Sequence, residues 1–201
     1  MPTRLTSALI FSLALISSAC GSSMKPSDIK QNPHPKQRYE ITLSVDDDAP
    51  GPFDAVTGFM QYEVAKNDPC APKDPISGLH EIPEQNPPIT FAKIDEHTYK
   101  GTVYTDLMQD DDYYGMGVCH WHMTFAVSLL KSKNNGVSFS PDLSLGEISA
   151  QQSKDFYFSK AAYLDTKSPS YPDSGQSLTD TVKKYRSDFF RVSISAKEVT
   201  P

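Results

Sequence analysis

Short runs of alternating apolar and polar residues dominate the chain from residue 38 onward. The clearest is 38–45, RYEITLSV, whose apolar members share one face of an extended strand: Tyr39, Ile41, Leu43 and Val45. Comparable alternation predicts strands over 56–64, 89–94, 98–105 and 189–199. The polar segment 95–97 joins two of these strands and is typical of a hairpin turn.

The longest predicted strand covers 118–130 and includes the sequence CHWHMTF. Since successive side chains of a strand point to opposite faces, its odd-numbered residues form one apolar row: Cys119, Trp121, Met123, Phe125, Val127 and Leu129. We expect this row in the core, with His120 and His122 on the opposite, partly solvated face. The pair Asn135-Gly136 then predicts a tight hairpin back to a strand over 137–140.

Helical patterns are sparse. The segment 156–163 fits either a strand or a short helix, and 178–186 has modest helical character. Many short strands and 16 prolines favour an all-β fold, an antiparallel β-sandwich or barrel-like single domain with long proline-rich loops and at most one short helix. Six of the prolines fall in 69–88, which we expect to form a long covering loop.

The first twenty residues carry a different pattern. Arg4 supplies a basic start, 5–16 is largely apolar, and small residues precede Cys20. This run is too short to span a bilayer as a permanent helix and fits a secretory signal. The sequence Ser17-Ser18-Ala19-Cys20 resembles the lipobox of bacterial lipoprotein signal peptides, with Ser17 where leucine is usual. An ordinary cleaved signal with an incidental cysteine is the alternative.

The lipoprotein resemblance implies cleavage of a signal peptide at 1–19, a diacylglycerol on the sulfur of Cys20 and an acyl chain such as palmitate on its new amino group. Three acyl chains would hold the protein on a membrane permanently. Gly21 stands where inner-membrane lipoproteins often carry aspartate, so we expect an outer-membrane anchor facing the periplasm. The polar segment 20–37 is expected to be a flexible, lipid-anchored tether and 38–201 a single β domain.

The chain has three cysteines, and lipidation of Cys20 leaves Cys70 and Cys119. An even pair in an oxidising compartment predicts a disulfide between them. Closing a loop of this length stabilises a fold by about 4 kcal/mol in the loop-entropy treatment. The alternative is two unpaired buried thiols.

Two runs of three aspartates stand out among the polar segments, and two tyrosines follow the second run. Consecutive carboxylates cannot all converge on one ion, and the spacing of a calcium-binding EF-hand is absent, so we expect solvated acidic loops. If both runs lay at one end of the domain, they would form a negative patch able to steer a basic partner. The candidate partner contacts are Asp46, Asp47, Asp48, Asp110, Asp111, Asp112, Tyr113 and Tyr114. A net charge of −6 disfavours nucleic-acid binding.

Motifs for catalysis are nearly absent: the sequence has no GxSxG, no HExxH and no phosphate-binding glycine loop, and it points to no cofactor. The SxxK match at 128–131 needs a helix to bring serine and lysine together, whereas the pattern here predicts a strand. His120 and His122 would project together, about 7 Å apart, and could share a metal if a third ligand joined them. Metal binding is therefore an alternative function.

The expected function is that of a membrane-anchored periplasmic protein-binding lipoprotein, an immunity or inhibitor protein that neutralises a toxin or an envelope enzyme. The plan of lipobox, polar tether and compact β domain resembles the lipoproteins of periplasmic effector–immunity pairs. This resemblance rests on the plan alone and carries over no functional residues. A structural accessory subunit of an envelope or secretion assembly is the further alternative.

Overall fold

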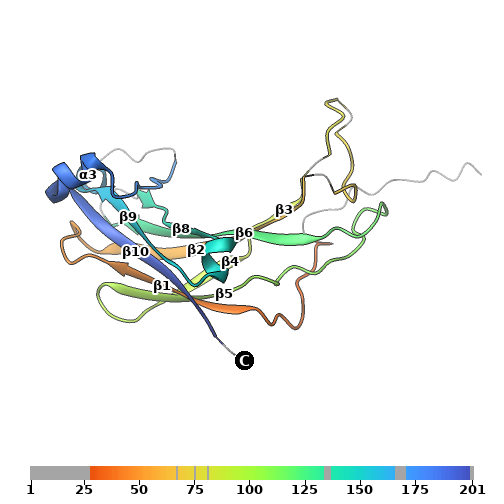
Figure 1. Cartoon of the computed structure of the whole chain (residues 1–201), viewed down its shortest axis with the longest axis horizontal. Helices are drawn as coiled ribbons and strands as arrows, with labels where there is room; N and C mark the ends of the chain where they lie inside the picture. Colours follow the sequence, from red (N-terminus) through yellow and green to blue (C-terminus); the bar gives the residue numbers. More distant parts are fainter. Residues whose placement is uncertain are drawn as a thin grey trace, which may run out of the picture.

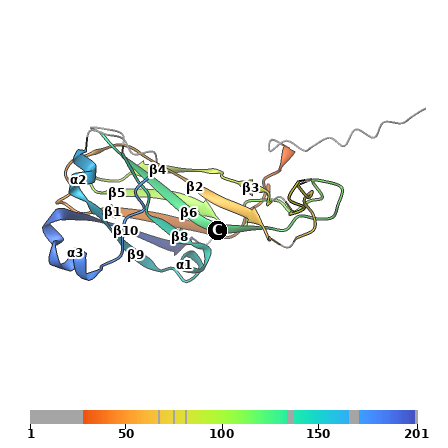
Figure 2. The ribbon, with the colours of Figure 1, turned by 90° about the horizontal axis from the view of Figure 1, so that it is seen from above.

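The fold is an antiparallel, nearly closed β-barrel, given by a computed structural model that describes residues 28–66, 68–74, 76–80, 82–133, 137–165 and 171–199 (Figures 1 and 2). Eight strands follow one path of neighbours in the order β7–β6–β2–β4–β5–β1–β10–β9, while β3 pairs with β2 and β8 with β6. The all-β prediction is confirmed. The strands are β1 (Arg38–Val45), β2 (Phe53–Val64), β3 (Glu84–Gln85), β4 (Pro88–Lys93), β5 (Thr98–Tyr104), β6 (Trp121–Ser132), β7 (Ser138–Phe139), β8 (Asp142–Ser144), β9 (Ser153–Ser159) and β10 (Phe189–Glu198).

Strands β1 and β10 follow their predicted alternation. The four apolar residues predicted for the inner face of β1 are buried, and so are the corresponding residues of β10: Phe190, Val192, Ile194 and Ala196. The predicted hairpin also forms, because β4 and β5 pair antiparallel on either side of the turn at 95–97. The local sequence pattern was sufficient to predict the inner faces of these two strands, because neither β1 nor β10 is interrupted by a bulge.

The alternation predicted for β6 holds only as far as Met123. Beyond it the even-numbered residues are the buried ones, so placing Phe125, Val127 and Leu129 in the core row was wrong. The reason lies in the pairing with β2, where Gln61 opposes Phe125 but Tyr62 opposes Met123. One residue of β6 between them has no partner, and such a bulge exchanges the two faces of the strand beyond it.

Aromatic rings fill one end of the barrel interior. Phe139, from the two-residue strand β7, lies 5.1 Å from the ring centroid of Phe158 and 5.2 Å from that of Phe190. Tyr163 and Phe53 join this cluster with centroid distances of 5.8–6.3 Å to their neighbours. Most of these pairs meet edge to face, the arrangement that aromatic quadrupoles favour.

The gap between the edge strands β7 and β9 is bridged by a short connecting segment. The N–H of Asp173 donates to the carbonyl of Ser138, and its own carbonyl accepts from the N–H of Ser140, both at 2.8 Å. On the other side, Gln176 and Tyr157 exchange two backbone hydrogen bonds of 2.8 and 3.1 Å. This segment, residues 173–176, is called the closing segment below, because it links the two edges of the barrel.

Three helices of five residues each form in the described chain, where at most one short helix was expected: α1 (Leu145–Ser149), α2 (Lys160–Leu164) and α3 (Asp180–Lys184), followed by the 3₁₀ turn η2 (Arg186–Asp188). The helical character of 178–186 is thus confirmed. The segment 156–163 contains both alternatives, the end of β9 and the start of α2. Helix α1 begins at a capping box, in which Ser144 and Glu147 satisfy each other's backbone N–H groups.

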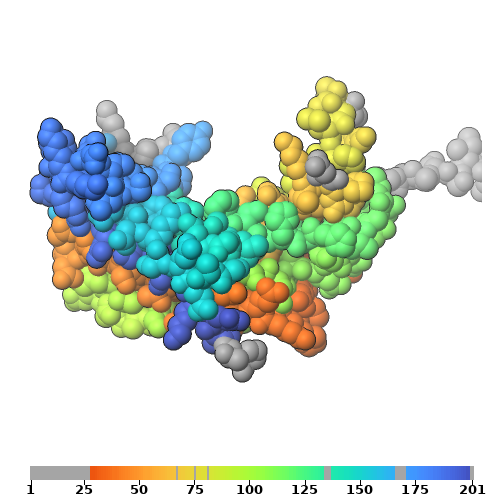
Figure 3. Space-filling model, in the orientation of Figure 1, coloured from red at the N-terminus to blue at the C-terminus, as the bar shows by residue number. Residues whose placement is uncertain are grey.

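Two loop predictions have different outcomes. The proline-rich segment 69–88 does not cover the barrel but protrudes from it, with Ile76 94 % exposed (Figures 1 and 3). The covering-loop prediction was therefore wrong, because this loop is held by its own turn and a disulfide rather than by burial. The tight turn predicted at Asn135-Gly136 lies outside the described residues, although the return strand β7 pairs with β6 as expected.

The folded part includes residues assigned to the tether. Gln31 forms an isolated β-bridge with Met108, and Ile29 packs against the core. The predicted signal peptide and the predicted lipidation residue Cys20 lie outside the described residues. In the region that the structure covers, no helix is long and apolar enough to cross a membrane.

Candidate functional site

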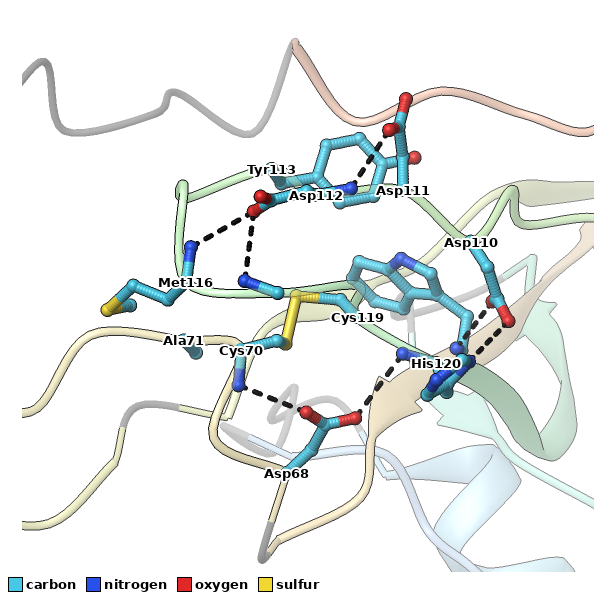
Figure 4. The surroundings of a disulfide bond; sticks show 12 residues. Asp68, Cys70, Ala71, Asp110, Asp111, Asp112, Tyr113, Met116, Cys119 and His120 are labelled. Carbon is cyan, nitrogen blue, oxygen red and sulfur yellow. Dashed lines mark hydrogen bonds and ion pairs between the residues drawn. A yellow bond between two sulfur atoms is a disulfide. The ribbon is translucent and has the colours of Figure 1, made fainter.

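Cys70 and Cys119 form the predicted disulfide, with their Cα atoms 5.1 Å apart (Figure 4). Both residues are buried in a small cluster with Val64, Ala71 and Tyr113. The bond joins the protruding loop after β2 to the loop between β5 and β6. The described residues of 28–32, 68–82 and 106–120 are called the stapled end below.

The second aspartate run lies at the stapled end and organises it. Asp110 accepts a hydrogen bond from the backbone N–H of Trp121 at 2.9 Å and binds Nδ1 of His120 at 2.8 Å. This carboxylate raises the pKa of His120 by hydrogen bonding and by its charge. The Asp68 carboxylate, from the other loop, accepts from the backbone N–H groups of Cys70 at 3.0 Å and His120 at 3.4 Å (Figure 4). The two loops are therefore joined by polar contacts as well as by the disulfide.

The carboxylates of Asp111 and Asp112 also bind partners within the stapled end. Asp111 forms an ion pair with Lys30 at 2.9 Å, which lowers the pKa of the carboxyl and raises that of the ammonium. Asp112 accepts from the backbone N–H groups of Met116 at 3.1 Å and Gly117 at 3.3 Å. All three carboxylates of this run therefore have partners within the protein, in a loop held to the N-terminal segment.

The two tyrosines after this run face the fold. Tyr113 is buried, and its hydroxyl donates to the carbonyl of Gln109 at 2.7 Å while its ring meets Trp121 edge-on. Tyr114 is partly buried and packs against the disulfide cluster. The contact area expected from Tyr113 is thus not on the surface, because the ring supports the loop from inside.

In the first aspartate run, the Asp46 carboxylate is largely buried, whereas those of Asp47 and Asp48 are more exposed. Asp46 is 18 % exposed and lies between Arg186 at 2.8 Å and Arg191 at 2.9 Å. Asp48 pairs with Lys160 at 2.9 Å. These contacts join the β1–β2 loop to helix α2, turn η2 and strand β10. The described residues of 46–52, 160–165 and 171–188 are called the helical end below.

The two aspartate runs lie at opposite ends of the barrel, so they do not form the joint negative patch that a common end would have given. Asp46 follows the end of β1, beside Thr98 at the start of β5, whereas Asp110 follows the end of β5. In Figure 2 the stapled and helical ends are separated by the length of the barrel.

Within the first run, Asp47 is 97 % exposed and its carboxylate lies 3.7 Å from His97.

His120 and His122 are both exposed, as expected. His122 lies 3.7 Å from Glu63, whereas His120 pairs with Asp110. Nowhere in the described ranges do three or more histidine, cysteine, aspartate or glutamate side chains gather closely enough to hold a metal ion. Metal binding by these histidines stays a prediction, and the described residues supply no third ligand for it.

An apolar pocket opens at the mouth of the barrel, at the helical end. Its volume is about 340 Å³, and its walls include Val45, Ala49, Phe53 and Tyr99. Charged side chains stand at its rim: Lys93, Glu96 and His97. Because His97 also contacts the exposed Asp47, the pocket and this carboxylate form one continuous surface. We call this surface the mouth site.

No family model, curated protein or solved structure matches this chain. The properties of its own surface therefore carry the functional argument.

A second hollow, on the outside of the barrel, differs from the mouth site in character. It is an open groove of about 720 Å³ on the outside of β4 and β5, lined by residues such as Thr90, Thr102 and Tyr104. Lys100 and Glu40 are its charged lining residues and neutralise each other at 2.7 Å. Among the described residues that line this groove, there is neither an unpaired charge nor a nucleophile with an adjacent base.

Exposed large apolar side chains gather at both ends of the barrel. Five belong to the stapled end: Ile76, Leu79, Ile82, Met116 and Val118. Four belong to the helical end: Leu164, Tyr171, Leu178 and Tyr185. Figure 3 shows the two ends rising on either side of a hollow along the barrel. Sequence patterning missed these residues, because loop residues have no periodicity that marks which side chains face water.

Proposed function

We propose that this protein is a lipid-anchored protein of the cell envelope that binds and inhibits another protein, in the manner of an immunity protein. The lipobox-like sequence at 17–20 supports the anchor. The mouth site supports the binding role, and it is the observation that carries the proposal. An apolar pocket beside an exposed carboxylate suits a partner segment with an apolar side chain next to a basic one.

The pocket has the features of an interface anchor point. Binding energy in protein interfaces concentrates where an apolar side chain fills a desolvated pocket, with charged groups around it. Val45, Ala49, Phe53 and Tyr99 supply the apolar walls, and Asp47 supplies a charge with almost full exposure. An exposed charge of this kind increases the association rate of a partner of opposite sign. The proposed partner surface is therefore basic.

The location of the mouth site also agrees with an anchored binder. The N-terminal segment runs along the stapled end, where Asn32 donates to the carbonyl of Leu107 at 2.7 Å. A lipid attached ahead of this segment would place the stapled end nearest the membrane. The mouth site lies at the opposite end and would face the periplasm, where a soluble partner can reach it.

Affinity capture from envelope extracts tests this function. The bait is the full-length lipidated protein, compared with Asp47→Lys and with Asp47→Lys/Ala49→Trp, in which the larger ring fills the pocket. We expect the wild type to enrich a basic protein that both variants lose. Glu198→Lys is the matched control, since this exposed residue pairs with Tyr39 at the other end of β1. Equal recovery by the wild type and both mouth variants would contradict the assignment.

A further inference from the structure

The tip of the stapled end carries two apolar side chains, Ile76 and Leu79, next to a set of short-range hydrogen bonds. The Asp74 carboxylate accepts from the backbone N–H groups of Ile76 at 2.9 Å and Ser77 at 2.6 Å. The Asp74 backbone exchanges hydrogen bonds with Gly78 and Leu79, at 2.9 and 2.8 Å. Ile76 is 94 % exposed and Leu79 71 % exposed. The turn therefore holds both side chains in solvent by its own hydrogen bonds.

The base of this turn is fixed to the rest of the stapled end. Lys73 and His80 form an isolated β-bridge, and the His80 ring binds the carbonyl of Ala71 at 2.7 Å. Ala71 is buried next to the disulfide of Cys70. The tip is thus the end of a braced arm, which Figures 1 and 3 show standing clear of the barrel.

The N-terminal segment enters the domain at this same end. Ile29 packs against the disulfide cluster, and the carbonyl of Lys30 accepts from the N–H of Gln109 at 3.1 Å. Seven residues lie between Cys20 and Asp28, so the Cα atoms of these two residues cannot be more than about 29 Å apart even when the chain is fully extended. A lipid on Cys20 would therefore keep the stapled end close to the membrane surface.

We propose that the tip of this arm is a second membrane contact, with Ile76 and Leu79 entering the interfacial layer of the lipid. This inference rests on the proposed lipid anchor at Cys20. The surface that the tip contacts is a lipid bilayer rather than a protein, because the tether limits how far the stapled end can move from the bilayer. Ion pairs reduce the repulsion that a phospholipid surface would exert, since Lys30 neutralises Asp111 and His120 pairs with Asp110.

The contact gives the anchored domain a fixed orientation. Acyl chains alone leave a protein free to rotate about its tether, whereas an added apolar contact restricts the domain to one pose. In that pose the tip of the arm meets the lipid, and the mouth site lies at the other end of the barrel.

Tryptophan fluorescence in brominated vesicles tests the contact. The full-length lipidated protein is reconstituted into phosphatidylcholine vesicles that contain dibrominated phosphatidylcholine, whose bromines quench nearby indoles. The variant Ile76→Trp is compared with Tyr171→Trp, a matched control that replaces an 82 % exposed aromatic residue at the helical end. The wild type, whose one tryptophan is Trp121, gives the background.

We expect the added indole of Ile76→Trp to lose about half of its emission at an interfacial depth, and that of Tyr171→Trp to keep its emission. Equal quenching of both variants, or quenching of neither, overturns the tip contact. Vesicle flotation separates this failure from failure of the anchor. If the wild type floats but Ile76→Trp is not quenched, the anchor stands and the tip contact is wrong; if the wild type floats no better than Cys20→Ala, both proposals fall.

Discussion

Gly175 lies so close to Phe158 that a Cβ atom at residue 175 would stand 2.6 Å from a ring carbon. Its φ of +67° is also a conformation that residues with a side chain rarely adopt. Since Gly175 belongs to the closing segment, and Phe158 to the aromatic cluster, this contact joins barrel closure to core packing. It makes residue 175 a position where glycine is needed for two independent reasons.

We expect Gly175→Ala to lower the free energy of unfolding by about 2–4 kcal/mol, through overpacking and backbone strain. Urea denaturation followed by tryptophan fluorescence measures the change. Gly146→Ala is the control, because a Cβ there meets nothing within 4 Å. That variant should be neutral or slightly stabilising, since alanine favours helix α1. If the two variants have the same stability, barrel closure does not depend on this glycine.

The disulfide joins two cysteines that are 49 positions apart in the sequence. Replacing both cysteines, Cys70→Ser with Cys119→Ser, should lower the free energy of unfolding by about 4 kcal/mol in the loop-entropy treatment. Denaturation of the wild type with and without reductant gives an independent measurement. Two labelled thiols in the unfolded, unreduced wild type would show that the bond does not form.

Neighbouring aspartates in the first run should respond differently to the same change. Asp46→Asn removes a charge that lies between Arg186 and Arg191, so we expect a loss of about 1–3 kcal/mol in unfolding free energy. Asp47→Asn removes a charge that is 97 % exposed, and a change within about 0.5 kcal/mol is expected. Thermal or urea denaturation compares them directly. A larger loss for Asp47→Asn would refute the structural role given to Asp46.

The pair formed by His120 and Asp110 should be visible in a pH titration. Because the carboxylate holds the pKa of His120 above its usual value, the pair stabilises the fold below the unfolded pKa of about 6.5. That contribution is lost as the pH rises through the higher folded pKa. NMR titration of the His120 ring should give a midpoint above 6.5, which Asp110→Asn lowers. A midpoint that Asp110→Asn leaves unchanged would exclude this cause.

Strand positions and core faces were largely predictable where the determining information is local. The alternation of 38–45 and 189–199 placed β1 and β10 correctly, since both strands run without a bulge. The second half of β6 could not be predicted in this way. Its bulge is defined by the partner strand, where Gln61 and Tyr62 oppose residues that are not adjacent.

The partners of surface residues were harder still to predict, because they come from distant parts of the chain. The run 46–48 looks like free negative charge in the sequence. In the structure, however, Asp46 pairs with Arg186, which lies 140 residues further along the chain. The disulfide was predictable because setting aside Cys20 as the expected lipidation site leaves an even pair of cysteines. The mouth site was not, because its walls come from four strand ends that only the barrel brings together.

The orientation proposed for the two ends of the barrel follows from a lipid at Cys20. Intact-mass spectrometry of the protein extracted from its native membranes tests this directly. The predicted result is a mature chain that begins at Cys20 and carries the mass of a diacylglycerol and one further acyl chain, with Cys70 and Cys119 oxidised. A mature chain without acyl mass, or one that begins at another residue, would contradict the account.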